Sequence, residues 1–143
     1  MGGQQSFAVA GLHPRVTHMI VHVPAGADTN APLHGRQQGY PWFDLKDPKK
    51  AEVARYVDTI NFSPQIRAKS LVSMGFVDTV TPPAGIWTAF NLIRGPKEAV
   101  PLVDAPHNNL ATPEQQQAFF ERSNAWWEAL AKGQSVPVKK PIK

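Results

Sequence analysis

The sequence lacks cysteine altogether, which removes disulfides, thiol nucleophiles and thiolate metal ligands from consideration. It also lacks any stretch close to the ~20 apolar residues that a membrane-spanning helix requires. The N-terminus has neither the basic start nor the apolar centre of a signal peptide, so the chain as printed is expected to be cytoplasmic and to have no membrane partner. Charged residues make up only 18% of the 143 positions and hydrophobic residues 42%, which predicts one globular domain.

The net charge of +4 and the isoelectric point near 9.6 are the only compositional features that suggest a nucleic-acid partner. The basic residues are scattered, except in a loop at residues 46–50 and in the tail at residues 134–143. Pro137 and Pro141 interrupt that tail, which is predicted to be a solvated, disordered end after a folded part at residues 1–133. No nucleic-acid-binding motif accompanies the charge, so no nucleic-acid partner is expected.

Several histidines in the first third of the chain raise the question of a metal site, namely His13, His18, His22 and His34. The β-branched residues around His18 and His22 predict a strand, in which these two side chains stand ~13 Å apart, too far to share one ion. The same pair on a helix would suit zinc, but the surrounding sequence argues against a helix. We expect no metal site and no cofactor.

Apolar runs and helix signals alternate along the chain, which predicts an α/β fold with about three parallel strands and flanking helices. The last helix has a clear start, because Thr112, Pro113 and Gln115 form the pattern of an N-cap and its capping glutamine. Its buried stripe is expected to contain Ala118, Phe119, Trp126 and Leu130. The other expected elements are helices at 3–11, 51–59 and 83–93, and strands at 17–23, 69–76 and 98–103.

Two residues with acid–base chemistry follow two of the predicted strands. Asp78 comes after the run at 69–76, and His107 comes after the strand at 98–103. Ligands bind at the carboxyl ends of the strands in open α/β sheets, so these side chains are expected to converge across 29 residues of sequence (107 minus 78). A histidine oriented by a carboxylate is the general base of acyl-transfer enzymes. Taken singly, Asp78 also fits a turn and His107 an ordinary loop.

The first residues, from Met1 to Ala8, resemble the segment after the nucleophile elbow of α/β-hydrolases. In that Gly-x-Ser-x-Gly turn, a serine is presented between a strand and a helix. If the serine belongs immediately before Met1, Gly2 is the closing glycine and residues 3–11 are the helix behind the elbow. The nucleophile is then expected outside the printed chain, since Ser6 falls inside this helix. Glycines after an initiator methionine are also common at termini with no function.

Several further stretches match one known family in order along the chain: Met1–Gln4, Ala10–Val16, Val23–Pro24, Ile60–Ile66, Met74–Pro83 and Ala89–Glu98. They resemble the C-terminal half of the α/β-hydrolases of the acetyl xylan esterase and cephalosporin C deacetylase family. The resemblance implies that Asp78 is the triad acid, that His107 is the triad base and that the backbone N–H of Met1 is an oxyanion donor. The sequence departs from the family pattern at Asn108, where glutamate is usual.

The resemblance implies a carboxylic ester hydrolase that acts on a small acyl ester, such as an acetyl ester, by a Ser-His-Asp mechanism. It also implies that the serine and the strands before it lie outside this sequence, so that the fold is a truncated α/β-hydrolase. Intact relatives that act on plant polysaccharide can be exported. Whether this chain is an enzyme stays open, because it could instead be a catalytically silent, self-associating remnant or carry a rebuilt site without serine.

The long insertion after the strand at 17–23 contains the aromatic residues Tyr40, Trp42 and Phe43. One interpretation is that they rim the substrate pocket of a hydrolase. The other is that they fill a small core beneath the loop.

The strand at 17–23 is expected to be a bare apolar edge, because the resemblance puts its outer neighbour outside this chain. A strand suited to burial on both faces tends to pair with another strand. The sequence therefore predicts a homo-oligomer that assembles through residues 17–23.

Overall fold

Three apolar stretches form the parallel sheet that organises the molecule: β1 (His18–Val21), β2 (Lys69–Gly75) and β3 (Lys97–Leu102). The computed structural model describes residues 1–139, and within this part the strand order is β1-β2-β3. Both pairings are parallel, with His18 opposite Lys69 and Ser70 opposite Lys97. The predicted α/β architecture of three parallel strands is confirmed.

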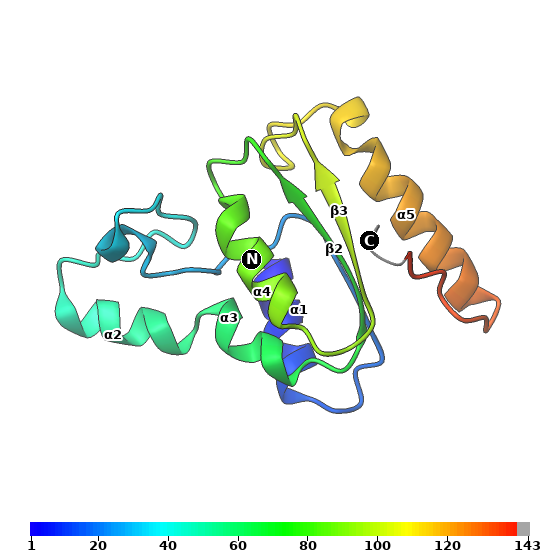
Figure 1. The fold of residues 1–143 in the computed structure, drawn as a ribbon, viewed down its shortest axis with the longest axis horizontal. Coiled ribbons are helices and arrows are strands. Elements are labelled where there is room, and N and C mark those ends of the chain that lie inside the picture. Colours follow the sequence, from blue (N-terminus) through cyan, green and yellow to red (C-terminus); the bar gives the residue numbers. More distant parts are fainter. Residues whose placement is uncertain (140–143) are drawn as a thin grey trace.

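Helices cover both faces of this sheet (Figure 1). α1 (Gly2–Leu12) and α4 (Pro83–Leu92) lie on one face, and α5 (Pro113–Ala131) lies on the other. Successive strand residues point to opposite faces, so Val72 packs with α1 and α4 while Leu71 packs with α5. The short helices are α2 (Pro48–Tyr56), α3 (Thr59–Phe62), η1 (Ala31–His34) and η2 (Ser63–Gln65).

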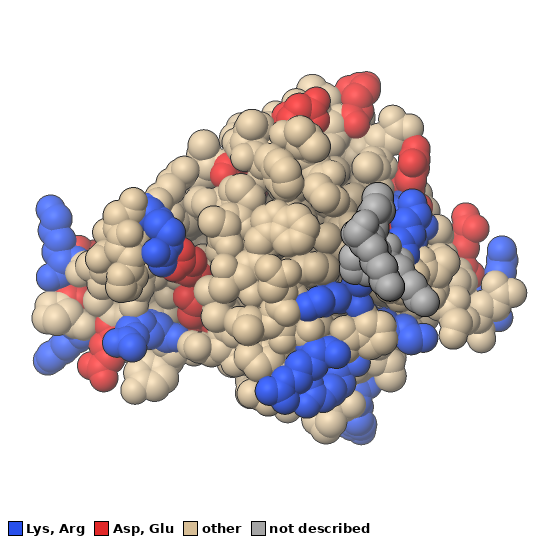
Figure 2. Space-filling model, viewed as in Figure 1, with Lys and Arg blue, Asp and Glu red and all other residues tan. Residues whose placement is uncertain are grey.

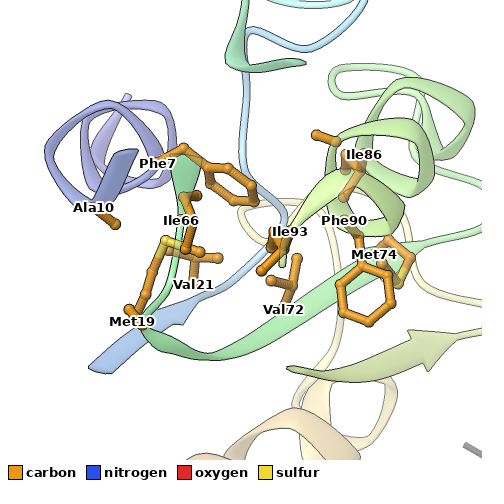
Figure 3. Close-up of a cluster of buried hydrophobic side chains, with 12 residues drawn as sticks. Phe7, Ala10, Met19, Val21, Ile66, Val72, Met74, Ile86, Phe90 and Ile93 are labelled. Atoms are coloured by element: carbon orange, nitrogen blue, oxygen red, sulfur yellow. The ribbon is translucent and has the colours of Figure 1, made fainter. Parts of the chain in front are cut away.

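The core between the sheet and the pair α1 and α4 is apolar (Figure 3). Phe7 reaches from α1 and Phe90 from α4 toward the strand residues Val21, Val72 and Met74. Burying a side chain of this size stabilises the folded state by about 1.5–3 kcal/mol. These contacts fix α4 against β2, and α4 follows directly on the loop that carries Asp78.

The start of α5 agrees with the prediction. The hydroxyl of Thr112 accepts from the N–H of Gln115 at 3.4 Å, and the Gln115 side-chain oxygen accepts from the N–H of Thr112 at 2.9 Å. This capping box ends the loop after β3 at a defined residue. The position of His107 relative to α5 is set by this short connection.

The buried stripe of α5 differs from the prediction at one position. Phe119 and Trp126 are buried and Leu130 is partly buried, but Ala118 is exposed and Ser123 takes an inner place. Phe119, Ser123 and Trp126 are thus spaced by four and then three residues, which places them on one face of the helix.

Residues 134–139 also differ from the predicted disordered tail. Val136 is buried in the core beneath α5, and the Pro137 carbonyl accepts from the Arg122 guanidinium at 2.6 Å. The N–H of Lys139 donates to the Glu98 carboxylate at 2.8 Å. Burial of one valine and two charge-assisted hydrogen bonds hold this part of the tail on the α5 face. Residues 140–143, the rest of the predicted tail, lie outside the described residues.

A segment between β1 and β2 projects from the sheet as an arm, residues 29–57, which contains η1 and α2 (Figure 1). Asp58 fastens its base, because the carboxylate accepts from the N–H of Asp28 and from the N–H and hydroxyl of Thr29. Within the arm, the helix predicted at 51–59 starts earlier, at Pro48, and ends at Tyr56.

Charge is spread unevenly over the face shown in Figure 2. Lys, Arg, Asp and Glu side chains gather on the arm and around the rim, while the centre of this face, over α4, is largely uncharged. Among the helices of residues 1–139, none combines the length and the apolar character needed to cross a membrane.

Candidate active site

The carboxylate of Asp78 is fully buried in the turn that follows β2. Its Oδ1 accepts from the backbone N–H groups of Val80 at 2.8 Å and Thr81 at 2.7 Å. Its Oδ2 accepts from the Thr81 hydroxyl at 2.8 Å. An aspartate that accepts from its own turn is held in one orientation. The turn therefore fixes both oxygens before any partner side chain is added.

His107 lies in the loop that follows β3, and its Nδ1 is 2.8 Å from Oδ2 of Asp78. The carbonyl oxygen of His107 accepts from the N–H groups of Leu110 and Ala111, which makes a tight turn of residues 107–111. The imidazole is 19% exposed, whereas the carboxylate is 0% exposed. The structure thus brings together the two residues that the sequence predicted to converge, with the acid inside and the histidine facing outward.

Close approach of the two loops depends on a residue without a side chain. A Cβ at Gly75, the last residue of β2, would collide with the carbonyl oxygen of Ala105. The N–H of Phe76 also donates to the carbonyl of Leu102 at 3.0 Å. These contacts hold the ends of β2 and β3 together, so the side chains of Asp78 and His107 can meet.

The pair has the geometry of a histidine base oriented by an acid. A carboxylate accepts only, so the hydrogen of the imidazole lies on Nδ1 and Nε2 carries the lone pair. Within residues 1–139, no hydrogen bond engages Nε2 of His107. That nitrogen can take a proton, and Asp78 then stabilises the imidazolium.

Thr81 is a member of this site that the sequence analysis missed. Its hydroxyl donates to Asp78 and lies 3.2 Å from Nδ1 of His107, so its oxygen can also accept from the imidazole. A threonine three residues after an aspartate in a turn is the local signal that could have indicated it.

The aromatic residues of the insertion lie beside the loop of Asp78. The N–H of Tyr40 donates to the Val80 carbonyl at 2.7 Å, and the Tyr40 ring packs edge-on against Trp42 at 5.2 Å between centroids. Trp42 is 60% exposed, and Tyr40 and Phe43 are half-buried. A cavity of about 540 Å³ borders Asp78 in the same region, and its lining includes Arg36, Gln37, Phe76 and Pro83.

A larger open groove of about 1100 Å³ lies on the arm, between η1 and α2. Its lining includes Leu33, Arg55 and Tyr56 but neither Asp78 nor His107. The smaller cavity is therefore the one that adjoins the acid of the pair, although His107 is not among its lining residues.

Met1 occupies the N-cap position of α1, which begins one residue earlier than the predicted helix at 3–11. No hydrogen bond within residues 1–139 joins it to Asp78 or His107. Ser6 lies inside α1, where its hydroxyl donates to the carbonyl of Gly2 at 2.9 Å. Among the same residues, no group of three or more His, Asp or Glu side chains could hold a metal ion.

A family model described as acetyl xylan esterase matches residues 1–124. The chain belongs to the acetyl xylan esterase family. An acetyl esterase named Axe7A from Xylanibacter ruminicola is 38% identical over 103 residues, which cover 69% of this chain and 24% of that protein. This sequence similarity confirms the family resemblance predicted from the sequence.

Two solved acetyl xylan esterases share the fold. The enzyme from Paenibacillus sp. R4 superposes with a TM-score of 0.68 at 24% identity, covering 84% of this chain and 41% of that one. Acetyl xylan esterase 1 from Thermoanaerobacterium sp. gives a TM-score of 0.63 at 25% identity, covering 84% and 42%. The three strands and their helices are thus part of an α/β-hydrolase fold, and the chain spans less than half the length of these members of the acetyl xylan esterase family.

Proposed function

We propose that this chain supplies the base and the acid of a serine carboxylic-ester hydrolase of the acetyl-esterase type. The observation that carries the proposal is the 2.8 Å contact between Nδ1 of His107 and the buried carboxylate of Asp78. Membership of the acetyl xylan esterase family supports the hydrolase class and a small acyl ester as substrate.

In the proposed mechanism, a serine outside the printed chain, immediately before Met1, is the nucleophile. Nε2 of His107 takes the serine proton as the serine oxygen bonds to the acyl carbon, and then gives it to the leaving alcohol. A water molecule next attacks the acyl-serine, with His107 again as base, and the acid product and free serine result. Asp78 stabilises the imidazolium, and the backbone N–H of Met1 stabilises the developing oxyanion.

The cavity beside Asp78 and the aromatic residues near it are the proposed place of the ester. Its volume of about 540 Å³ lies within the ~300–1,000 Å³ that small-molecule sites usually have. Tyr40, Trp42 and Phe43 are not among the residues that line this cavity; they are the proposed outer rim of the site, since the N–H of Tyr40 donates to the carbonyl of Val80 in the Asp78 loop.

Hydrolysis of p-nitrophenyl acetate tests the proposal. We expect a longer polypeptide that begins before the nucleophile elbow to be active, and His107→Ala to lower kcat by at least about a thousandfold. His34→Ala, at an exposed histidine of the arm, is the matched control and is expected to change nothing. A His107→Ala variant as active as the parent would contradict the assignment of the base.

The 143-residue chain alone distinguishes the remaining alternatives. Activity that is lost in both His107→Ala and Asp78→Ala would indicate a rebuilt site that uses another nucleophile or water. Absence of activity in the chain alone, with activity in the longer polypeptide, is the result we expect. Absence of activity in both the 143-residue chain and the longer polypeptide would favour a catalytically silent remnant.

A second candidate function is self-association through β1, and one observation favours it. Within residues 1–139, β1 pairs only with β2, so its outer edge offers unpaired backbone groups. A groove of about 470 Å³ runs beside this edge, lined by Val9, Val16 and Met19 among others. Under this proposal a second copy of the chain adds its own β1 to the edge.

Sedimentation at a series of concentrations tests this pairing. We expect Val9→Lys to lower the proportion of dimer or larger species, because it puts a charge in the groove where the second copy would lie. Val53→Lys, at a residue of similar exposure on the arm, is the control. A monomer at all concentrations, or equal effects of the two substitutions, would contradict pairing through β1.

A further inference from the structure

A second histidine near the candidate site has both ring nitrogens engaged. His22 directly follows β1, and its Nδ1 lies 2.6 Å from the hydroxyl of Ser73 in β2. Its Nε2 lies 2.9 Å from the side-chain oxygen of Gln116 in α5. The ring also stacks on Phe119 at 4.3 Å between centroids, with the planes 12° apart. His22 therefore joins two strands to the helix that starts beside His107.

The surrounding hydrogen bonds determine the tautomer of His22. The Gln116 amide nitrogen donates to the carbonyls of Ala111 and Thr112, which leaves its oxygen facing the histidine. That oxygen can only accept, so Nε2 of His22 carries the hydrogen and Nδ1 accepts from the Ser73 hydroxyl. All of these groups are satisfied at once only when the imidazole is neutral.

The environment of the ring favours the neutral form as well. Burial is the largest effect and lowers the pKa of His22 below its ordinary 6.5; the Gln116 hydrogen bond opposes it. Two titratable groups of the site also act on it: His107, from the loop after β3, lowers the pKa, and Asp78, from the turn after β2, raises it. The net direction is downward, in agreement with the hydrogen bonds.

The network ends on the turn that carries the proposed base. Ala111, whose carbonyl accepts from Gln116 at 3.2 Å, donates its N–H to the carbonyl of His107 at 3.0 Å. Ser73, at the other end, is fully buried in β2, two residues before Gly75 and the turn of Asp78. One series of contacts therefore connects the strand before the acid with the turn that carries the histidine.

We propose that His22 is a positioning residue that holds the 107–111 turn so that His107 meets Asp78. It does so as the centre of a relay, the series of hydrogen bonds that joins Ser73, His22 and Gln116. The inference rests on the proposed function, because it assigns a role in placing the base of that reaction. The relay acts through the backbone of Ala111, so its loss loosens the turn without removing any group of the acid–base pair.

Nuclear magnetic resonance of the 143-residue chain labelled at histidine nitrogen tests the relay. In the wild-type chain we expect His22 to show a neutral ring with hydrogen on Nε2, and His107 to show a low-field Nδ1 proton bonded to Asp78. In Gln116→Leu we expect the amide hydrogens of Leu110 and Ala111 to exchange about tenfold faster, and the His107 proton signal to broaden.

Two further variants separate the relay from general loss of structure. Gln117→Leu, at the neighbouring exposed position of α5 whose amide donates to Glu121, is expected to match the wild type. Gln116→Glu keeps an acceptor for Nε2 of His22 but adds a negative charge, so the pKa of His22 is expected to rise. Circular dichroism is expected to show unchanged helix content in all of these variants.

The outcomes that overturn the inference differ from those that overturn the proposed function. A His22 ring with hydrogen on Nδ1, or a Gln116→Leu variant with wild-type exchange and an unchanged His107 proton, would overturn the relay alone. A wild-type chain without the low-field proton of His107 would contradict the acid–base pair, and the positioning role with it.

Discussion

The two faces of the sheet are joined to their helices by different kinds of contact. Between the sheet and the pair α1 and α4 lies a cluster of buried apolar side chains, which includes Phe7, Val72 and Ile93 (Figure 3). On the other face, Phe119 and Trp126 share the interface with a partly buried ion pair between Glu98 and Arg122 and with the relay around His22. The first face is mainly hydrophobic, with the Lys97 ammonium of β3 donating to the carbonyl oxygens of Phe90 and Ile93 at the end of α4, whereas the other face combines apolar contacts with several directional polar ones.

The contrast indicates which face controls the geometry of the candidate site. Hydrophobic contact is non-directional, so it packs α1 and α4 on the sheet without selecting particular polar partners. Hydrogen bonds and bidentate ion pairs weaken when their geometry is lost, so they hold α5 in one position against β3. Because α5 starts just after the turn of His107, the polar face is the one that places the proposed base.

The largest effect is expected from breaking the apolar face. Phe7→Ala leaves a cavity among residues that are almost completely buried, so we expect the free energy of unfolding to fall by about 3–5 kcal/mol. Urea unfolding measures it, with Val9→Ala, at a 54% exposed position of the same helix, as the control. A loss below about 1 kcal/mol for Phe7→Ala would mean that the apolar face contributes less than its burial indicates.

A smaller loss is expected from the polar face. The Glu98 carboxylate accepts from Arg122 at 2.6 and 2.9 Å and from the N–H of Lys139 at 2.8 Å. Glu98→Ala leaves the partly buried guanidinium of Arg122 without this partner, so we expect the free energy of unfolding to fall by about 2–3 kcal/mol. Glu128→Ala, at an exposed position of α5, is the control and is expected to have little effect. Equal stability of the two variants would contradict a structural role for the ion pair.

Acid pH is expected to weaken the polar face selectively. Burial alone raises the pKa of Glu98, but the Arg122 hydrogen bond and the Lys139 N–H outweigh it, and the pKa falls below its ordinary 4.5. Because the pKa in the folded state is the lower one, this stabilisation is complete above pH 4.5 and is lost as pH falls through the folded value.

The measurement is urea unfolding at a series of pH values below neutral. Glu98→Gln is expected to lose less stability than the wild type between pH 4.5 and more acid conditions, since it has no carboxyl group to protonate there. The Phe7→Ala variant is expected to keep the wild-type slope. A Glu98→Gln variant with the same slope as the wild type would assign the acid effect to other groups.

The smallest effect is expected at the start of α5. Thr112→Ala removes the side-chain half of the capping box, so we expect a loss of about 1 kcal/mol in the free energy of unfolding. Thr112→Ser keeps the hydroxyl and is expected to recover most of the loss. Comparable destabilisation by both substitutions would show that the hydrogen bond to Gln115 is not its cause.

Local patterns in the sequence were sufficient for the strands, for the start of α5 and for the acid–base pair. Short apolar runs mark β1 and β2, and the spacing of Thr112 and Gln115 marks a helix start, because each depends on neighbours in the chain. Asp78 and His107 were predicted to meet because parallel strands bring their carboxyl ends to one edge. The roles of Met1, Tyr40, Trp42 and Phe43 in binding an ester stay predictions.

The errors and omissions concern contacts between distant parts of the chain. The proline and lysine residues after position 133 suggested an unpacked tail, although Val136 is buried, because composition does not indicate that the core beneath α5 can receive it. Ala118 was assigned to the buried face of α5 as an apolar residue, although the polar Ser123 takes the inner place in the folded helix. Gln116 carries no local signal of its contact with His22, since only the completed fold brings them together.

The network around His22 also has a consequence for folding kinetics. His22 contacts Ser73 across 51 positions of sequence and Gln116 across 94. Parallel strand pairs and contacts of such long range form slowly, because long segments of chain must be ordered before these contacts stabilise them. The hydrogen bonds of His22 can therefore all exist only after β1, β2 and α5 have assembled, and the resonances of its ring report the arrival of the native state in a refolding experiment.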